Sequence, residues 1–449
     1  MTGRESLFHG IAVVIDDEIE KPESSIKKIT EAIVGAGCHV VTLKTLPNEA
    51  SVVNLREVAF LVLDWNLGAA AIAEIGGEGI MPPETLTQEN EDAVIAFLKQ
   101  LKETRFAPVF IFTNESVEAI EDRLRAHPDL YNESDPSHIL VKSKSYVIEK
   151  GVFSVLDDWV SSAPSAFVLK SWERQYEKAK NELFLDFYTK STIWPLILWE
   201  TFKADGVPPA SLLGEIIGGN LASRMSPLDC DLEPFLKLLS GLDKADYREA
   251  VIRVLEGERF LKKERLDDGS CEPGDIFKLP KGVFLINIRP LCDCVPRNGE
   301  PMDSLVLYTL EGSKKSDASL AKSFKPDFGL IEEQDNQAVV FPVLDGKALV
   351  FNFKEIHFKT WGEVKNQRVG RLLPPFLTRL QQRFAANLQR PGLTRLPSTL
   401  FDGVNGATPM AEAGQSLDSD EGNDQSTPPR GGCLFSWPWN RPADNGPTR

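Results

Sequence analysis

Residues 1–160 of this 449-residue chain predict an α/β fold built on a five-stranded sheet. Short apolar runs rich in β-branched residues alternate there with segments whose apolar residues recur at helical spacing. Uninterrupted apolar strands are typical of parallel sheets, which helices cover on both faces. The sheet is therefore expected to be parallel, with strands at Ile11–Ile15, His39–Leu43, Phe60–Leu63, Val109–Phe112 and Ile139–Val141.

Helices are expected between these strands and in the region that follows them. The first three cover Ser25–Val34, Ala93–Leu101 and Val117–Leu124. Residues 165–265 then read as a helical region, in which Pro195 is expected to break one helix. Apolar and aromatic residues recur there at near-helical spacing, which predicts packing in a core or against a partner helix; they are Trp172, Tyr176, Leu183 and Phe187.

Residues 270–398 predict a β-barrel-like module, a small antiparallel barrel or sandwich, that ends in a helix beginning at Pro374-Pro375. Its expected strands are Val283–Ile288, Leu305–Leu310, Val339–Val343 and Leu349–Phe353. Residues 400–449 have the composition of a disordered tail. The spacing of Cys271, Cys292 and Cys294 matches no paired zinc motif, so ordinary core or turn cysteines are expected and metal binding stays open.

Charge and composition exclude several classes of protein. The chain has 50 basic and 66 acidic residues, and a net charge of −16 disfavours binding to nucleic acid. No apolar run is long enough to cross a bilayer, and the N-terminus lacks a signal-peptide layout. Six cysteines are too few for a disulfide framework. We therefore expect a soluble, cytoplasmic protein with neither a nucleic-acid nor a membrane partner.

The stretch from Asn366 to Pro397 is an exception, because it carries six arginines and no acid. A basic helix of this kind suits nucleic acid, a membrane surface or an acidic partner. We expect it instead to dock on acidic groups of the predicted α/β part of the chain or of the tail.

Polar residues stand where four of the expected strands end. They are the pair Asp16-Asp17, then Asp64, Thr113 and Lys142. In an open α/β sheet these strand ends converge on one crevice, where ligands bind. Three carboxylates close together repel one another, and a hard divalent cation such as Mg²⁺ relieves that repulsion. Thr113 and Lys142 would contact phosphate oxygens beside the metal, which predicts phosphoryl transfer onto a carboxylate.

These segments resemble the receiver domain of two-component response regulators. The resemblance rests on Val13–Glu18, Leu61–Asp64, Phe110–Thr113 and Leu140–Lys142. It implies a receiver over residues 1–160 with a flavodoxin-like, doubly wound sheet. It also implies that a histidine kinase or a histidine phosphotransfer protein phosphorylates Asp64.

The resemblance assigns a role to each of the other site residues. Asp17 would bind Mg²⁺ directly, Asp16 largely through water, and Asn66 through its backbone carbonyl. Thr113 would donate a hydrogen bond to the phosphoryl group, and Lys142 would pair with it.

The chain departs from the receiver pattern in three places. Ser143 follows Lys142, where the family usually has proline, and Ile139 stands where an aromatic residue commonly reports phosphorylation. Asp64 and Thr113 are 49 positions apart, longer than usual, and the surplus holds Gly76–Gly79 and Met81–Pro83. We expect an enlarged loop there. A haloacid-dehalogenase phosphatase needs a second acid where this chain has Asn66, which argues against that class.

The sequence says less about the effect of phosphorylation than about its site. None of the five histidines lies between residues 139 and 356, and no kinase ATP motif or P-loop occurs. The chain is thus expected to receive phosphate, as a sink or relay partner that shares a kinase with a second receiver protein. In layout it resembles the accessory receiver of Detocs-type antiphage phosphorelays, which implies a role in antiphage defence. An unrecognised effector in the C-terminal region and a degenerate receiver scaffold remain alternatives, and no separate catalytic domain is recognised.

Overall fold

The computed structural model describes residues 5–55, 57–67, 84–104, 106–131, 138–240, 242–297, 299–392, 394 and 396–401. The predicted loop with Gly76–Gly79 and Met81–Pro83 lies outside these residues, as does nearly all of the predicted tail. Residues 1–389 form one compact unit and residues 390–449 a second. The subdivision of the first unit into receiver, helical region and β-rich module stays a prediction.

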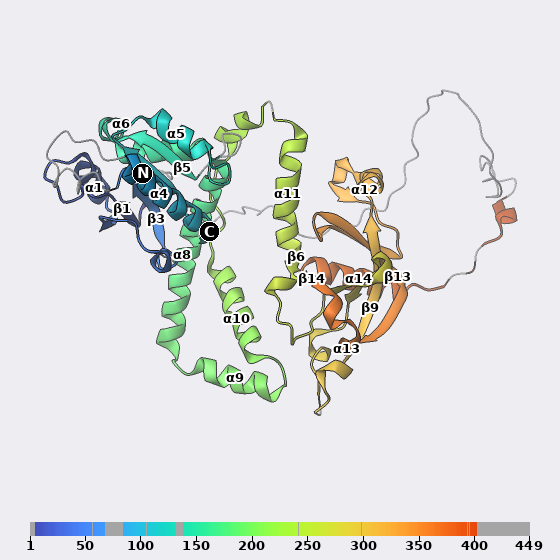
Figure 1. Cartoon of the computed structure of the whole chain (residues 1–449). Helices are drawn as coiled ribbons and strands as arrows, with labels where there is room; N and C mark the ends of the chain where they lie inside the picture. Colours follow the sequence, from blue (N-terminus) through green and yellow to red (C-terminus); the bar gives the residue numbers. More distant parts are fainter. Residues whose placement is uncertain are drawn as a thin grey trace, which may run out of the picture. The chain divides into compact units, whose positions relative to one another are not determined.

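A five-stranded, all-parallel sheet forms the first part of the chain, which confirms the predicted α/β class (Figure 1). The strand order is β2-β1-β3-β4-β5. The strands are β1 (Ile11–Ile15), β2 (His39–Leu43), β3 (Val58–Leu63), β4 (Val109–Thr113) and β5 (Ile139–Ser143).

Helices cover both faces of this sheet because successive strand residues point to opposite sides. On one face, Val14 and Phe60 pack with α1 (Ser25–Gly35), α6 (Lys144–Lys150) and α7 (Val152–Val160). On the other, Val13 and Leu61 pack with α2 (Glu49–Val52), α4 (Glu84–Thr104) and α5 (Val117–Arg125). Two apolar cores thus fix the register of the strands and the position of their carboxyl ends.

Strands β4 and β5 end later than the sequence pattern predicted. Thr113 and Ser143 are the last residues of the two strands and pair with each other. Ser143 is also the N-cap of α6, because its side chain accepts a hydrogen bond from the backbone N–H of Tyr146 at 3.2 Å. Lys144 is therefore the first residue of a helix that starts directly at the strand end.

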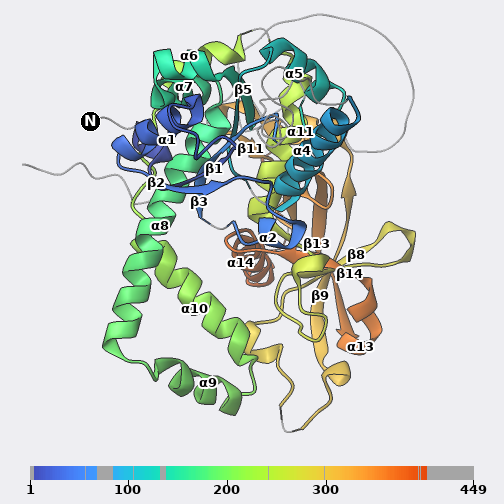
Figure 2. The same ribbon diagram turned by 60° about the vertical axis from the view of Figure 1, so that its left-hand side comes forward.

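The next region is helical, as predicted. Its helices are α8 (Pro164–Lys190), α9 (Trp194–Ala204), α10 (Pro209–Arg224) and α11 (Lys244–Arg259), with a 3₁₀ turn at Glu233–Leu239. Figure 1 and Figure 2 show α8 and α10 side by side, with α9 connecting them at one end. Pro195 lies in the first turn of α9, where proline is tolerated, so it begins a helix rather than breaking one. Within the described residues, no helix is long and apolar enough to cross a membrane.

A seven-stranded antiparallel sheet forms the β-rich part, in the order β12-β13-β9-β8-β7-β14-β6. Its strands are β6 (Phe260–Lys262), β7 (Asp275–Lys278), β8 (Phe284–Asn287), β9 (Val306–Lys315), β12 (Gln337–Val343), β13 (Lys347–Thr360) and β14 (Arg368–Leu372). This antiparallel sheet is consistent with the predicted β-rich module, and its barrel-like closure stays a prediction. Helix α14 (Phe376–Leu388) packs on it through Leu377 and Leu380.

The arginine-rich stretch is neutralised by acids of the β-rich part itself. Arg368 and Arg371 are buried against Asp275, at 3.3 Å and 2.7 Å. Arg379 and Arg383 of α14 both pair with Glu333. The expected docking on the α/β part or the tail is therefore wrong for these four arginines.

Candidate functional site

Three carboxylates meet at the carboxyl edge of the parallel sheet. Asp16 and Asp17 follow β1, and Asp64 follows the neighbouring strand β3, whose Leu63 pairs with Ile15. Oxygen atoms of all three side chains lie within 4.8 Å of one another. Backbone hydrogen bonds hold both strand ends, from Asp16 N to Leu43 O and from Asp64 N to Ile15 O, each 2.9 Å. The predicted convergence of these three acids is therefore present.

The lysine of this cluster is Lys144, and the assignment of Lys142 is corrected here. Lys144 Nζ lies 2.7 Å from Asp16 Oδ2 and 2.9 Å from Asp64 Oδ2. Its side chain is only 1% exposed, so the ion pairs are shielded from water. Lys142 is half-buried in β5 opposite Phe112, and no ion pair from it to these acids occurs in the described part of the chain.

The later end of β5 explains this correction. The sequence pattern ended the strand at Lys142, but Ser143 continues it and then caps α6. The residue placed at the crevice is therefore the first one of the helix. The sequence does carry a signal for this, because Lys-Ser-Lys offers a second lysine after a serine suited to capping.

Thr113 and Asn66 occupy the expected elements. Thr113 is fully buried at the end of β4, and its Oγ1 accepts a hydrogen bond from Glu115 N at 3.0 Å. Because the backbone takes the oxygen as acceptor, the hydroxyl proton is left to donate. Asn66 is half-buried two residues beyond Asp64. Trp65, between them in the sequence, is buried in the apolar core on one face of the sheet.

Burial sets the electrostatics of the cluster. It raises the pKa of Asp64 to about 6, with Lys144 opposing and Asp16 adding to the increase. Burial likewise raises the pKa of Asp16, against the attraction of Lys144. Burial by itself would lower the pKa of Lys144, but Asp64 and Asp16 together raise it. One ammonium group thus compensates the two carboxylates of Asp16 and Asp64 only in part.

The donor set fits a hard divalent cation. Mg²⁺ prefers oxygen ligands and takes one or two carboxylates while retaining waters. Asp16, Asp17 and Asp64 supply converging carboxylate oxygens, and a cation would relieve the charge that Lys144 leaves uncompensated on Asp16 and Asp64. In the described part of the chain, no other group of three acidic, histidine or cysteine side chains converges in this way.

The three cysteines of the β-rich part do not converge as a metal site within the described residues. Cys271 and Cys294 are buried, and Asn287 Nδ2 lies 3.7 Å and 3.4 Å from their sulfur atoms. Cys292 is exposed.

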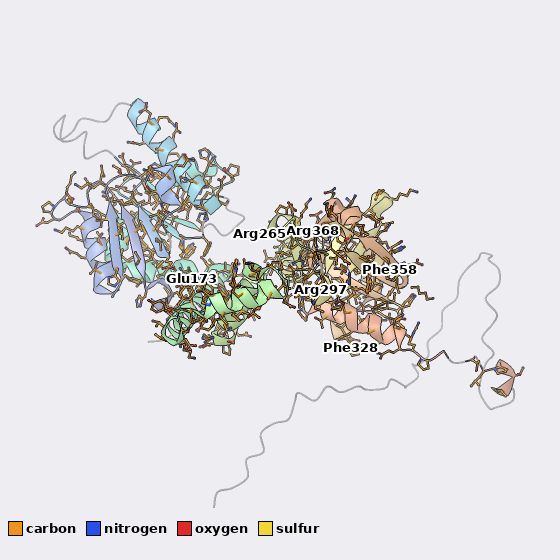
Figure 3. The ribbon with its side chains drawn as sticks, turned by 90° about the horizontal axis from the view of Figure 1, so that it is seen from below. Glu173, Arg265, Arg297, Phe328, Phe358 and Arg368 are labelled. Carbon is orange, nitrogen blue, oxygen red and sulfur yellow. The ribbon has the colours of Figure 1, made fainter. Side chains whose placement is uncertain are left out.

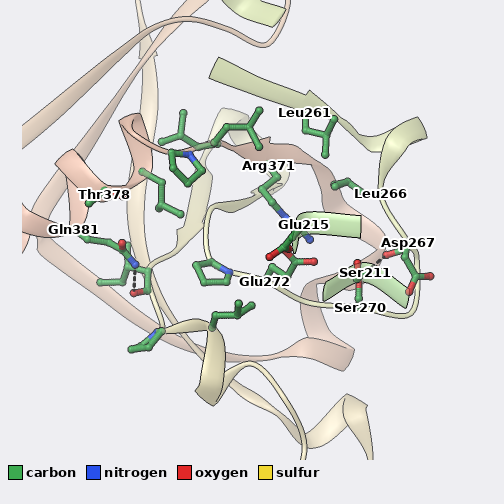
Figure 4. Close-up of a pocket in the computed structure, with 18 of the residues that line it drawn as sticks. Ser211, Glu215, Leu261, Leu266, Asp267, Ser270, Glu272, Arg371, Thr378 and Gln381 are labelled. Carbon is green, nitrogen blue, oxygen red and sulfur yellow. Dashed lines mark hydrogen bonds and ion pairs between the residues drawn. The ribbon is translucent and has the colours of Figure 1, made fainter. Parts of the chain in front are cut away.

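A pocket lies in the β-rich part of the chain, close to Cys271 and Cys292 in the sequence. No pattern in the sequence predicted it. Its volume is about 1050 Å³, and Glu215, Glu272 and Arg371 lie together in it (Figure 4). Arg371 Nη1 pairs with Glu272 at 2.5 Å. Burial, with the nearby Glu272, raises the pKa of Glu215. The rest of the lining is largely apolar, so this hollow has the composition of a ligand pocket rather than of a phosphoryl-transfer site.

No protein-family model matches the sequence, and no curated protein matches it either. A functional conclusion therefore depends on the geometry of the sites described above.

The two lysines provide a matched test of the corrected geometry. Lys144→Met should lower the free energy of unfolding by about 3 kcal/mol in chelator, because it leaves two buried carboxylates without their counter-charge. Lys142→Met should change it by less than about 0.5 kcal/mol, as expected at a half-exposed position. Urea denaturation of both variants measures the difference. Equal losses, or a larger loss for Lys142→Met, would contradict the placement of Lys144.

The raised pKa of Asp64 predicts a pH-dependent gain from its removal. The ionised form of Asp64 is disfavoured in the fold, so the parent loses stability as the pH rises from its usual 3.8 through about 6. Asp64→Asn escapes this loss and should be more stable than the parent by about 1–3 kcal/mol near pH 7 in chelator. The difference in stability between the two proteins should be smallest near pH 4, where Asp64 is largely protonated in the fold. Thermal denaturation across this range checks it, and an Asn variant that is less stable at neutral pH would refute the stated charge balance.

Proposed function

We propose that the chain is a phosphoacceptor protein of a bacterial two-component phosphorelay and that Asp64 receives the phosphoryl group. The observation that carries this proposal is the buried contact of Lys144 with both Asp16 and Asp64 beside Asp17. The strand order β2-β1-β3-β4-β5 supports it, because that order is found in flavodoxin-like folds, to which receivers belong. Under this proposal residues 1–160 are a doubly wound receiver domain.

The reaction is an in-line transfer from a phosphohistidine to a carboxylate. Lys144 holds Asp64 Oδ2, so we assign Oδ1 as the attacking oxygen. The new bond joins this oxygen to phosphorus, and the phosphorus–nitrogen bond breaks with its electrons remaining on the imidazole. The products are an acyl phosphate on Asp64 and a free histidine. Water attack on the acyl phosphate would later return Asp64 and inorganic phosphate.

The surrounding side chains would stabilise the charge of the transferred group. Lys144 Nζ can donate to a phosphoryl oxygen without leaving Asp16, since an ammonium group carries three donors. The Thr113 hydroxyl, buried at the next strand end, would donate to a second oxygen. Bound Mg²⁺, held by Asp16, Asp17 and Asp64 with the Asn66 carbonyl as a further ligand, would neutralise charge on the incoming phosphate.

We further propose that the chain acts as a phosphate sink or relay partner beside a second receiver. Lys144 is followed by Ser145, and Val141 stands three residues before it, so the aromatic switch of the family is missing in this register too. The antiphage role stays a prediction from the resemblance in layout. A second candidate, an effector in the C-terminal region, is favoured by the pocket of about 1050 Å³.

Phosphorylation can be tested without the cognate kinase. Phosphoramidate with Mg²⁺ should label the parent and Lys142→Met, whereas Asp64→Asn should take up no label and Lys144→Met at least about tenfold less. The readout is intact-protein mass, with peptide mapping to locate the phosphate. Chelator should abolish labelling. Undiminished labelling of Asp64→Asn would overturn the proposal.

The sink role is separable from phosphorylation itself. In a mixture of a phosphorylated histidine kinase and a second receiver, adding the parent chain should lower the phosphate found on the second receiver. Asp64→Asn should leave that phosphate unchanged, which makes it the matched control. If phosphorylated parent leaves the flow unchanged, the sink role is wrong and the effector alternative gains support.

A further inference from the structure

The helices α8, α9 and α10, here called the helical arm, expose an unusual amount of apolar surface. Seven large apolar side chains of α8, α9 and their connection are between 41% and 76% exposed. We call these side chains together the apolar face; they are Phe184, Leu185, Tyr188, Ile193, Leu196, Ile197 and Trp199. A hollow of about 700 Å³ is lined by three of them, Phe184, Leu185 and Tyr188, and by neighbours such as Trp194. Exposed apolar patches of this size mark interaction sites.

The helices of the arm pack against each other on their inner side, so the exposed apolar side chains do not mean that the arm is unfolded. Arg224 of α10 pairs with Asp186 of α8 at 2.7 Å and lies over the ring of Phe187. The Phe187 ring meets that of Trp194 edge-on at 5.1 Å. Farther along α8, Lys170 donates a hydrogen bond to the carbonyl of Ala59 at 3.2 Å and so ties the arm to the parallel sheet.

Helix α9 contacts α10, but it buries none of its own residues fully. It has 11 residues with the sequence WPLILWETFKA, and none of them is buried. Isolated helices of this length are marginal in water, and most helical stability in proteins comes from packing an apolar side. A second surface against α9 would supply that packing.

We infer that the apolar face binds a second copy of this chain, so that two arms pack against each other in a homodimer. Its seven side chains are on average about 60% exposed. If each is given the roughly 150–250 Å² of an aromatic side chain, they offer on the order of 800 Å² to a partner that covers all of them. That is the area each partner contributes to a stable interface of standard size.

The charges around the face favour self-association over an acidic or basic partner. Exposed Glu182 and Glu200 are matched by exposed Lys190 and Lys203, so this surface carries both signs. A balanced surface can meet its own copy without net repulsion, even though the whole chain carries −16. A strongly charged partner would instead select a face of one sign.

Sedimentation equilibrium of the full chain tests this inference. The parent should sediment as a dimer, and Leu185→Glu should raise the dimer dissociation constant by roughly 100-fold or more, because it places an unpaired charge in an apolar interface. Leu196→Glu, on α9, should act in the same direction. Far-UV circular dichroism shows whether each variant is folded, as expected for positions that are 67% and 66% exposed.

Phe328→Glu is the matched control, since Phe328 is 76% exposed in the β-rich part and is labelled in Figure 3. It should leave the dimer intact. A parent chain that sediments as a monomer would overturn the inference. It would do so even if a variant without residues 402–449 then dimerised, because that result would mean that these residues cover the apolar face. A dimer that both arm variants leave unchanged would overturn it as well.

Discussion

The contact of Lys144 with Asp16 and Asp64 is the interaction on which the candidate site depends. Two carboxylates and one ammonium group are buried together, and such a group is costly unless each charge is compensated. The surrounding fold is arranged to meet that demand. Asp16 also accepts a hydrogen bond from Glu18 N at 2.8 Å, which fixes one carboxylate oxygen while Lys144 holds the other.

The parallel sheet brings these groups together from distant parts of the chain. Lys144 lies 128 positions from Asp16 and 80 from Asp64. Neighbouring β1 and β3 bring the acids together, and Ser143, which ends β5 and caps α6, places Lys144 at the start of the helix beside them. Under the proposed function, the same buried charges that weaken the metal-free fold would bind a cation and a phosphoryl group, so stability and that function would oppose each other.

The sequence predicted the parallel sheet well because both of its faces are buried, which makes its strands continuous apolar runs. Asp16, Asp17 and Asp64 followed from that pattern, since each stands within two residues of a strand end. The lysine was misplaced because capping by Ser143, rather than hydrophobicity, decides where β5 ends. The pocket with Glu215 and Arg371 was missed because its lining residues are spread along the chain from Ser211 to Phe384. A local sequence pattern does not indicate contacts between residues so far apart.

A structure determined with Mg²⁺ and beryllium fluoride, which mimics a phosphoryl group on aspartate, tests the central claim most directly. The account predicts the mimic bonded to Asp64, a cation held by Asp16, Asp17 and Asp64, and Lys144 Nζ within hydrogen-bonding distance of a fluorine atom. Lys142 should stay outside this contact. A mimic bonded to another residue, or Lys142 in the place of Lys144, would contradict the account.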